Sequence, residues 1–307
     1  MTPQEFNYLR VILNERSGLS LSEERRELLE ARLRPLLKTL DIPSVSALVL
    51  ALMRPDGEYL RMRVAQAVSV QESYFFRDKA PFQYFTESML PKLMVARAGT
   101  RRIRLWSAAA ATGQEPYSLA MLLADRAHML ADWRIEILAT DFAEDALRKA
   151  QTGLYSQFEV QRGLPVSLLV RHFRKVGTGW EISPEIRAMV KLRAHNLLLD
   201  DPELGTFDVI FCRNVLIYFD DDTKRQVLGR LAATLPSDGY LVLGASETTT
   251  GISRDFVAVP EGQHGVFMLS PEARAGRAAR KGQVAEDGGT VSGATPDPVR
   301  SVAQSHR

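Results

Sequence analysis

The sequence has little cysteine, little histidine and no long hydrophobic run. Its one cysteine cannot form a disulfide within the chain. The five histidines are scattered and no HExxH or CxxC spacing occurs, so we expect no bound metal. No run approaches the ~18 apolar residues of a membrane span, and none resembles a signal peptide. These absences predict a reduced, soluble, cytoplasmic protein without direct membrane insertion.

The sequence also lacks a strong excess of either charge. Lys and Arg number 39 against 37 Asp and Glu, so the formal net charge is +2. A charge this small gives no reason to expect a nucleic-acid partner. The 307 residues are 45% hydrophobic and 25% charged, which is typical of a globular chain with about two domains.

The first part of the chain, residues 6–63, has the 3.6-residue apolar period of helices. Ser20 and Glu23 have the spacing of a capping box, which predicts a helix start near Leu21. Pro35 is expected to kink or split that helix. The polar side of the stretch carries Arg25, Arg26, Arg32, Arg34 and Lys38, interleaved with Glu27 and Glu30. Periodicity alone favours a solvated face with ion pairs between neighbouring turns.

From residue 102 to residue 269, short β-rich runs alternate with helical patterns. Strands are predicted at 103–106, 135–140, 190–194, 207–212 and 240–244. This alternation predicts an α/β fold with a mainly parallel sheet covered on both faces. Gly and Pro clusters between about 155 and 190 predict a small insert that contains a hairpin. The tail beyond Ser270 has no periodicity and is predicted to be disordered.

The turn after the first predicted strand has unusually small side chains. Ala109, Ala111 and Gly113 occupy alternate positions there. Ligands of open parallel sheets bind beyond the carboxyl ends of the strands, so we expect this turn to make room for one. The G-x-G-x-x-G pattern of dinucleotide folds is missing, and Glu115 at the helix start would repel a pyrophosphate. An ordinary tight turn is the alternative.

Two further strand ends carry polar residues that should meet this turn. Asp141 ends the second predicted strand, where a carboxylate can accept both hydroxyls of a ribose or can cap a helix. Arg213 and Asn214 end the strand at 207–212. The three strand ends therefore predict one polar crevice.

Six segments taken together resemble a known family. They are SVQESYFFRD, LWSAAAATGQEPYSLAMLL, LATDF, RAHNLL, FDVIFCRNVLIYFD and GYLVLGASE, in this order. The combination, from about residue 5 to 270, is similar to the CheR family of chemotaxis receptor methyltransferases. The resemblance implies a small all-helical domain at 1–68 that docks on the receptor. It further implies a Rossmann-like S-adenosylmethionine (SAM) methyltransferase domain at 69–270, a β-subdomain insert at about 155–190 and a disordered tail at 271–307.

The resemblance also implies the residues that bind SAM and its product S-adenosylhomocysteine (SAH). They are Gln71, Ser73, Arg77, Ala109, Gly113, Glu115, Asp141, Asn196, Leu197, Asn214 and Val215. Arg77 would grip the carboxylate end of the cofactor, and Glu115 would face its ammonium or sulfonium. Asp141 would hold the ribose. Gln71 departs from the Asn or Thr that is frequent in the family.

The implied reaction moves a methyl group from SAM to glutamate side chains in the cytoplasmic helices of chemoreceptors, and the implied enzyme acts as a monomer. Glutamate, with a pKa of about 4.3, is already ionised at neutral pH, so no general base is needed. Arg213 and Tyr218 could orient the incoming carboxylate, although Tyr218 in an apolar run could equally pack in the core. Under this resemblance Arg25, Arg32, Arg34 and Lys38 become the docking face.

Three other functions compete with this interpretation. A non-catalytic SAM- or SAH-binding signalling module would keep the pocket without turnover. A methyltransferase of a non-chemotaxis signalling array would act on a different target. A nicotinamide-dependent oxidoreductase on the same sheet is disfavoured by the missing glycine pattern.

Overall fold

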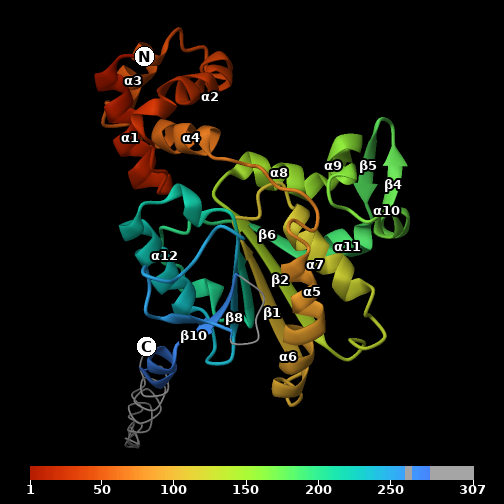
Figure 1. Ribbon diagram of the computed structural model, residues 1–307. Coiled ribbons are helices and arrows are strands. Elements are labelled where there is room, and N and C mark those ends of the chain that lie inside the picture. Colours follow the sequence, from red (N-terminus) through yellow and green to blue (C-terminus); the bar gives the residue numbers. More distant parts are fainter. Residues whose placement is uncertain (260–264, 277–307) are drawn as a thin grey trace, which may run out of the picture.

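The computed structural model describes residues 1–259 and 265–276, which form a helical N-terminal part and a larger α/β part (Figure 1). The N-terminal helices are α1 (Pro3–Ser17), α2 (Arg26–Thr39), α3 (Val45–Leu52) and α4 (Glu58–Val68), with a 3₁₀ turn at Glu23–Arg25 before α2. A capping box starts α1, because Thr2 accepts from the Glu5 amide while the Glu5 side chain accepts from the Thr2 amide. Their shared core includes the fully buried Phe6, Leu9, Leu13, Leu33 and Leu48.

Two details of the predicted helix differ from the structure: its capping residue and the expected split at Pro35. Ser20 does not cap it: Ser22 precedes the 3₁₀ turn and makes no side-chain capping bond. The Ser20 amide instead donates to the Tyr218 carbonyl, a contact between the two parts of the chain. Pro35 does not split α2, which continues to Thr39. Pro35 and Ala31, whose carbonyl it leaves unpaired, are both exposed, so water can satisfy that carbonyl.

The α/β part contains the predicted mainly parallel sheet. Its strands are β1 (Arg102–Ala108), β2 (Arg134–Asp141), β6 (Val190–Ala194), β7 (Val209–Cys212), β8 (Tyr240–Leu243), β9 (Phe256–Ala258) and β10 (Val266–Leu269). Their order is β6-β2-β1-β7-β8-β10-β9, parallel from β6 to β8 and antiparallel at β10 and β9. All five predicted strands are present. The final antiparallel pair was not predicted from the sequence.

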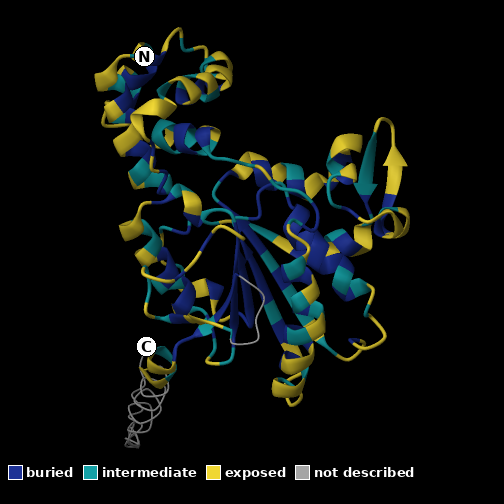
Figure 2. Ribbon diagram, viewed as in Figure 1, coloured by how far each residue is buried: buried dark blue, intermediate teal, exposed yellow. Residues whose placement is uncertain are grey.

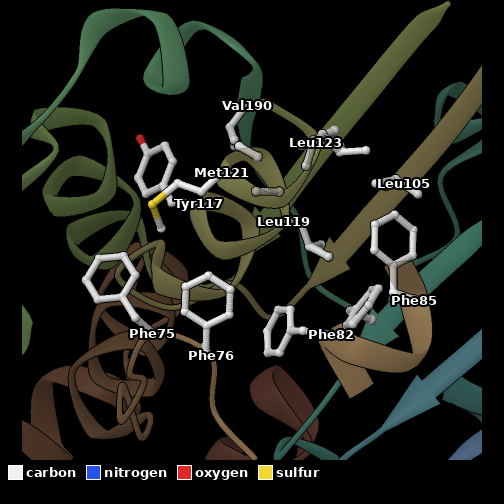
Figure 3. Close-up of a cluster of buried hydrophobic side chains, with 14 of the residues drawn as sticks. Phe75, Phe76, Phe82, Phe85, Leu105, Tyr117, Leu119, Met121, Leu123 and Val190 are labelled. Carbon is white, nitrogen blue, oxygen red and sulfur yellow. The ribbon is translucent and has the colours of Figure 1, made fainter. Parts of the chain in front are cut away.

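Helices cover both faces of this sheet (Figure 1). One face carries α5 (Ala80–Tyr84), a π-helical turn (Phe85–Met89), α6 (Leu90–Ala96) and α7 (Gln114–Ala124), and the other carries α12 (Asp221–Ala233). The central strands alternate accordingly: Phe211 of β7 packs toward α7, whereas Ile210 packs toward α12. Figure 3 shows aromatic rings from residues 75–85 beside apolar side chains of α7, and Figure 2 shows the buried centre of the sheet. The fully covered sheet leaves its strand ends as the place for polar chemistry.

The insert forms a second, small sheet beside α8 (Glu144–Thr152). It comprises β3 (Leu154–Ser156), α9 (Gln157–Gln161), α10 (Val166–His172), β4 (Phe173–Val176) and β5 (Gly179–Ile182), followed by α11 (Pro184–Ala188). The strand order is β3-β5-β4, all antiparallel. The Phe75 ring packs edge-on against Tyr155 at 5.0 Å and Phe173 at 5.6 Å between ring centres. The insert is thus attached to the segment that joins the two parts.

The C-terminal tail is described only at its start. Residues 271–276 are helical, although the sequence predicted disorder from residue 271. The Ser270 side chain and carbonyl accept the amides of Ala273 and Arg274, which begins this short helix. The rest of the predicted tail, 277–307, lies outside the described residues. Within the described ranges, no helix has the length and apolarity needed to cross a membrane.

Candidate functional site

The turn after β1 has a left-handed backbone at three alternate residues. The φ angles are +66° at Ala109, +48° at Ala111 and +94° at Gly113. The left-handed conformation costs a residue with a Cβ roughly 1 kcal/mol, so surrounding bonds must hold the two alanines in place. The Ala110 amide donates to the Thr140 carbonyl at 2.8 Å, and the Ala111 amide donates to Asp141 Oδ2 at 2.8 Å. The end of β2 therefore fixes the shape of the turn.

Asp141 is buried and braces two backbone segments. Its Oδ2 accepts from Ala111, and its Oδ1 accepts from the Ala143 amide at 2.8 Å. Burial raises the pKa of Asp141, and hydrogen bonds from Ala143, Ala111 and Gln71 oppose that rise. These three donors do not use up the roughly four lone-pair sites of a carboxylate, so the side chain can still accept a hydroxyl group of a ligand.

A cavity of about 110 Å³ lies beyond the strand ends. It is lined by Ser17, Leu19, Ser69, Val70, Gln71, Glu72, Ser73, Arg77, Ala109, Ala111, Glu115, Asp141, Phe142, His195, Asn196, Leu197, Arg213, Asn214, Val215, Tyr218 and Phe219. Every residue that the sequence assigned to the cofactor or to catalysis is in this lining except Gly113. A Cβ on Gly113 would meet Ala150, Tyr117 and Tyr155, so Gly113 faces the packing under α8. Its role is the left-handed turn rather than a wall of the cavity.

Glu115 and Arg213 form a buried ion pair at the floor of the cavity. Arg213 Nη1 donates to Glu115 Oε2 at 3.1 Å, and Ser107 donates to Glu115 Oε1 at 2.8 Å. Arg213 Nη2 donates to Asp78 Oδ2 at 2.7 Å and to the Arg77 carbonyl at 2.8 Å. Burial raises the pKa of Glu115, and the Arg213 charge opposes that rise. The pair locks β7, α7 and the segment around Asp78 together.

This pairing bears on the predicted roles of Arg213 and Glu115, which stay predictions. The two terminal nitrogens of Arg213 are bound by Glu115 and Asp78, so Arg213 is not free to receive an incoming carboxylate with both of them. Glu115 lines the cavity, but the charge expected to face an ammonium or sulfonium is balanced by Arg213. Both side chains therefore act first on the shape of the cavity.

Two polar atoms in the cavity lining have unmet hydrogen-bonding capacity. Gln71 Oε1 and Arg213 Nε are buried and have no partner among the residues that the structure describes. The Gln71 amide nitrogen is used, since it donates to the Ser69 hydroxyl at 2.8 Å. Buried polar atoms are nearly always hydrogen-bonded, so an unpaired acceptor and an unpaired donor here indicate a polar ligand. An ammonium suits the acceptor, and a carboxylate suits the donor.

Arg77 reaches the cavity from the segment between the two parts. Its Nη1 donates to the Glu72 carbonyl at 3.1 Å, and its guanidinium carbon lies 5.3 Å from the centre of the Tyr74 ring. Ser73 is on the same stretch of lining. Unlike Arg213, Arg77 has no carboxylate partner in the described part of the chain, so its charge remains available to an anionic group.

The loops after β6 and β7 close the other side of the cavity. Asn196 Nδ2 donates to the Arg16 carbonyl at 2.7 Å, and its Oδ1 accepts from the Leu198 amide at 3.0 Å. Its side-chain amide therefore joins the loop to the end of α1, while Leu197 supplies an apolar wall. Asn214 has a left-handed backbone, with φ +60°.

Sequence reasoning missed Glu247, which holds Asn214 in that conformation. Glu247 Oε2 accepts from the Asn214 and Gly244 amides at 2.7 Å each, and Oε1 accepts from Ile217 at 3.2 Å. The available signal is an acid directly after the three small residues that follow β8. Sequence reasoning also missed Ser17 and Leu19. No pattern near these residues indicates that the end of α1 packs onto a cavity whose other lining residues lie between 69 and 219.

Two of the four predicted basic docking residues, Arg25 and Arg32, lie beside the cavity. Arg25, Arg34 and Lys38 are exposed, whereas Arg32 is half-buried and donates to the Val68 carbonyl at 2.9 Å. A small depression lined by Arg25 and Arg32 shares Leu19, Val70 and Tyr218 with the cavity wall. The basic side of α2 and the cavity are therefore neighbours on the molecule.

Comparison with known proteins adds independent findings. One family model, described as the CheR methyltransferase SAM binding domain, matches residues 71–264, and another, the CheR methyltransferase all-alpha domain, matches residues 4–66. Chemotaxis protein methyltransferase 1 of Pseudomonas aeruginosa is 39% identical over 252 residues, 81% of this chain and 91% of that relative. Chemotaxis protein methyltransferase Cher2 of Pseudomonas putida is 37% identical over the same shares. Among solved structures, the CcbJ methyltransferase from Streptomyces caelestis is 18% identical over 50% of each chain, with a TM-score of 0.30.

Proposed function

Because the chain belongs to the CheR methyltransferase family, we propose that it is a chemotaxis protein methyltransferase that methylates glutamate side chains of chemoreceptors. The methyl donor is SAM, the product is SAH, and the modified carboxylates lie in the cytoplasmic helices of the receptor. The enzyme works in the cytoplasm as a monomer. The observation that carries the proposal is the cavity beyond the strand ends, with its unpaired Gln71 acceptor and Arg213 donor.

The residues of the cavity suit the parts of SAM. Asp141 accepts the ribose hydroxyls, and Leu197 with Val215 provides apolar walls for the adenine. Gln71 Oε1 accepts from the ammonium, while Arg77 and the Arg213 Nε donate to the carboxylate. The small side chains of Ala109 and Ala111 leave space for the cofactor in the cavity. Ser73 adds a hydroxyl group to the part of the lining that carries Gln71 and Arg77. When bound, SAM supplies a methyl group on a positively charged sulfur.

The protein contributes alignment rather than proton transfer. A glutamate carboxylate is ionised at neutral pH and accepts a methyl group without losing a proton, so no histidine or cysteine is needed. Tyr218, which lies between the cavity and the α2 depression, orients the incoming carboxylate through its hydroxyl. Ser17 and Leu19 cover the cavity and exclude water, which strengthens each polar contact inside it.

Labelled methyl transfer to purified receptor fragments tests this proposal. The expected product is an ester, so the label should be released as methanol by mild alkali, whereas methyl groups on nitrogen would stay bound. Fragments with glutamine at the target positions are the control. Tight SAH binding without transfer would replace the proposal with a non-catalytic signalling module. Transfer only to receptors of another signalling system would move the enzyme out of chemotaxis.

Charge reversal on α2 is expected to weaken receptor recognition without weakening cofactor binding. Arg34→Glu with Lys38→Glu removes two exposed positive charges that attract a glutamate-rich helix. We expect the KM for receptor fragments to rise roughly threefold or more at low salt, with unchanged SAH affinity. The wild-type KM should rise with ionic strength as well.

The matched control is Lys92→Glu with Lys191→Glu, which changes the net charge equally at two exposed lysines outside α2. An equal rise in KM for this control would assign the effect to overall charge. A KM that is independent of salt would contradict the docking role. The four basic residues would then belong to a solvated face that does not bind the receptor.

A further inference from the structure

Arg162 of the insert reaches the segment that carries Arg77. It directly follows α9, and its guanidinium carbon lies 4.3 Å from the centre of the Tyr74 ring. The Arg77 guanidinium carbon lies 5.3 Å from the same ring centre. One aromatic ring therefore contacts an arginine of the cavity and an arginine of the insert, and both contacts are favourable cation–π interactions.

Glu72 joins the same two arginines. Its carboxylate accepts from Arg162 Nη2 at 2.6 Å, and its carbonyl accepts from Arg77 Nη1 at 3.1 Å. The hydrogen bond from Arg162 and the charges of both arginines lower the pKa of Glu72. The negative charge offsets the repulsion between two cations on one ring, so Glu72, Tyr74, Arg77 and Arg162 form one connected group.

The residue after Arg162 fixes the position of the insert against this segment. Gly163 has a φ of +86°, and a Cβ there would collide with the Phe75 carbonyl oxygen. Phe75 in turn packs between Tyr155 and Phe173 of the insert. Because the backbones meet this closely, the Arg162 side chain has a defined place from which to act on Tyr74.

We propose that Arg162 is a positioning residue for the methyltransferase reaction: through Tyr74 and Glu72 it holds the Arg77 guanidinium at the cavity wall. The proposal rests on the proposed function, in which Arg77 binds the cofactor carboxylate. Arg162 is not among the residues that line the cavity, so its effect must pass through residues that do. It lowers the freedom of a long side chain whose alignment the cofactor site requires.

A double-mutant cycle on SAH affinity tests the proposal. Arg162→Ala is expected to weaken SAH binding by roughly threefold to tenfold, the size of one exposed cation–π contact together with one exposed ion pair. Arg162→Lys, which keeps the charge over Tyr74, should recover most of the affinity. In an Arg77→Ala background, Arg162→Ala should have no further effect, because it acts only through Arg77. Titration calorimetry gives each Kd.

Arg174→Ala is the control, since Arg174 is an exposed arginine of the insert that pairs with Glu181 and, within the described residues, makes no hydrogen bond or ion pair with residues 72–77. Its Kd for SAH should equal that of the wild type. An effect of Arg162→Ala that persists in full without Arg77, or an equal effect of Arg174→Ala, would overturn the proposal. If Arg77→Ala alone binds SAH normally, the assignment of Arg77 in the proposed function is wrong. The inference about Arg162, which depends on that assignment, is then wrong as well. If Arg77→Ala weakens binding and Arg162→Ala does not, only the inference fails.

Discussion

Arg213→Met is expected to lower the free energy of unfolding by about 3–5 kcal/mol, the usual cost of leaving a buried ion pair without one partner. Methionine keeps an unbranched stem but removes the donors that satisfy Glu115 and Asp78. Glu115 is buried, so its carboxylate cannot exchange the lost bond for water. Urea unfolding at pH 7 measures the loss. SAH binding should fall too, because the segment with Arg77 loses its anchor on β7.

The pH dependence of that loss follows from the pKa of Glu115. Burial already raises this pKa above its ordinary value of 4.5, and removing the Arg213 charge raises it further. Below the pKa that Glu115 has in the unfolded chain, its carboxyl group is protonated in both the folded and the unfolded state. Its titration then has no effect on the free energy of unfolding. As the pH rises, Glu115 loses its proton first in the unfolded state. The variant therefore loses stability between the unfolded pKa and the higher folded pKa of this residue. The gap between wild type and variant should therefore widen as the pH rises above the folded pKa of Glu115 in the wild type, by roughly 1.4 kcal/mol per pH unit at most.

The double variant Arg213→Met with Glu115→Gln is the control. It removes the buried carboxylate and leaves the Arg77 carbonyl and Asp78 without the Arg213 donor, and the Asp78 side chain is 32% exposed and can be solvated. This variant should regain much of the stability and lose the pH dependence. A gap that does not change with pH in the single variant would show that the loss comes from packing rather than from the buried charge.

Asp141→Ala is expected to weaken SAH binding by about 1–3 kcal/mol, or roughly fivefold to 150-fold in Kd. The change removes the acceptor for the ribose hydroxyls and also frees the amides of Ala111 and Ala143. The left-handed Ala111 then loses the bond that holds its turn. Calorimetry with SAH measures the affinity.

Asp145→Ala, at an exposed position at the start of α8, provides the control for removing an acid nearby. Asp141→Asn keeps one acceptor oxygen and places a donor where the second oxygen was, so its loss of affinity should be smaller than that of Asp141→Ala. Unchanged affinity in Asp141→Ala would remove Asp141 from the cofactor site.

The sequence predicts the architecture well because the sheet depends on local periodicity. The runs at 103–106 and 190–194 alternate with helical patterns, and the structure has strands at both, in a mainly parallel sheet. The small residues at the end of the first strand likewise predict space for a ligand. Both signals lie within a few residues of the feature they predict.

The errors arise where a distant residue decides the outcome. Ser20 matches a capping box but its amide bonds to Tyr218, about 200 residues further on. From the sequence, Arg213 is predicted to orient an incoming carboxylate, and the structure pairs it with Asp78, 135 positions away. Gly113 fits a cofactor turn, but its missing Cβ makes room for Tyr155 and Ala150. No pattern in a single sequence encodes these pairings.

The end of α1 and the residues just after it contribute to the cavity beyond the strand ends, with Ser17 and Leu19 in its wall and the Arg16 carbonyl bonded to Asn196. The helical part that carries the proposed docking surface is therefore not an interchangeable module. A chimera that takes residues 1–68 from a relative would import two cavity-wall residues together with the receptor preference. If the cavity holds the cofactor as proposed, such a hybrid should change in SAH affinity as well as in receptor target.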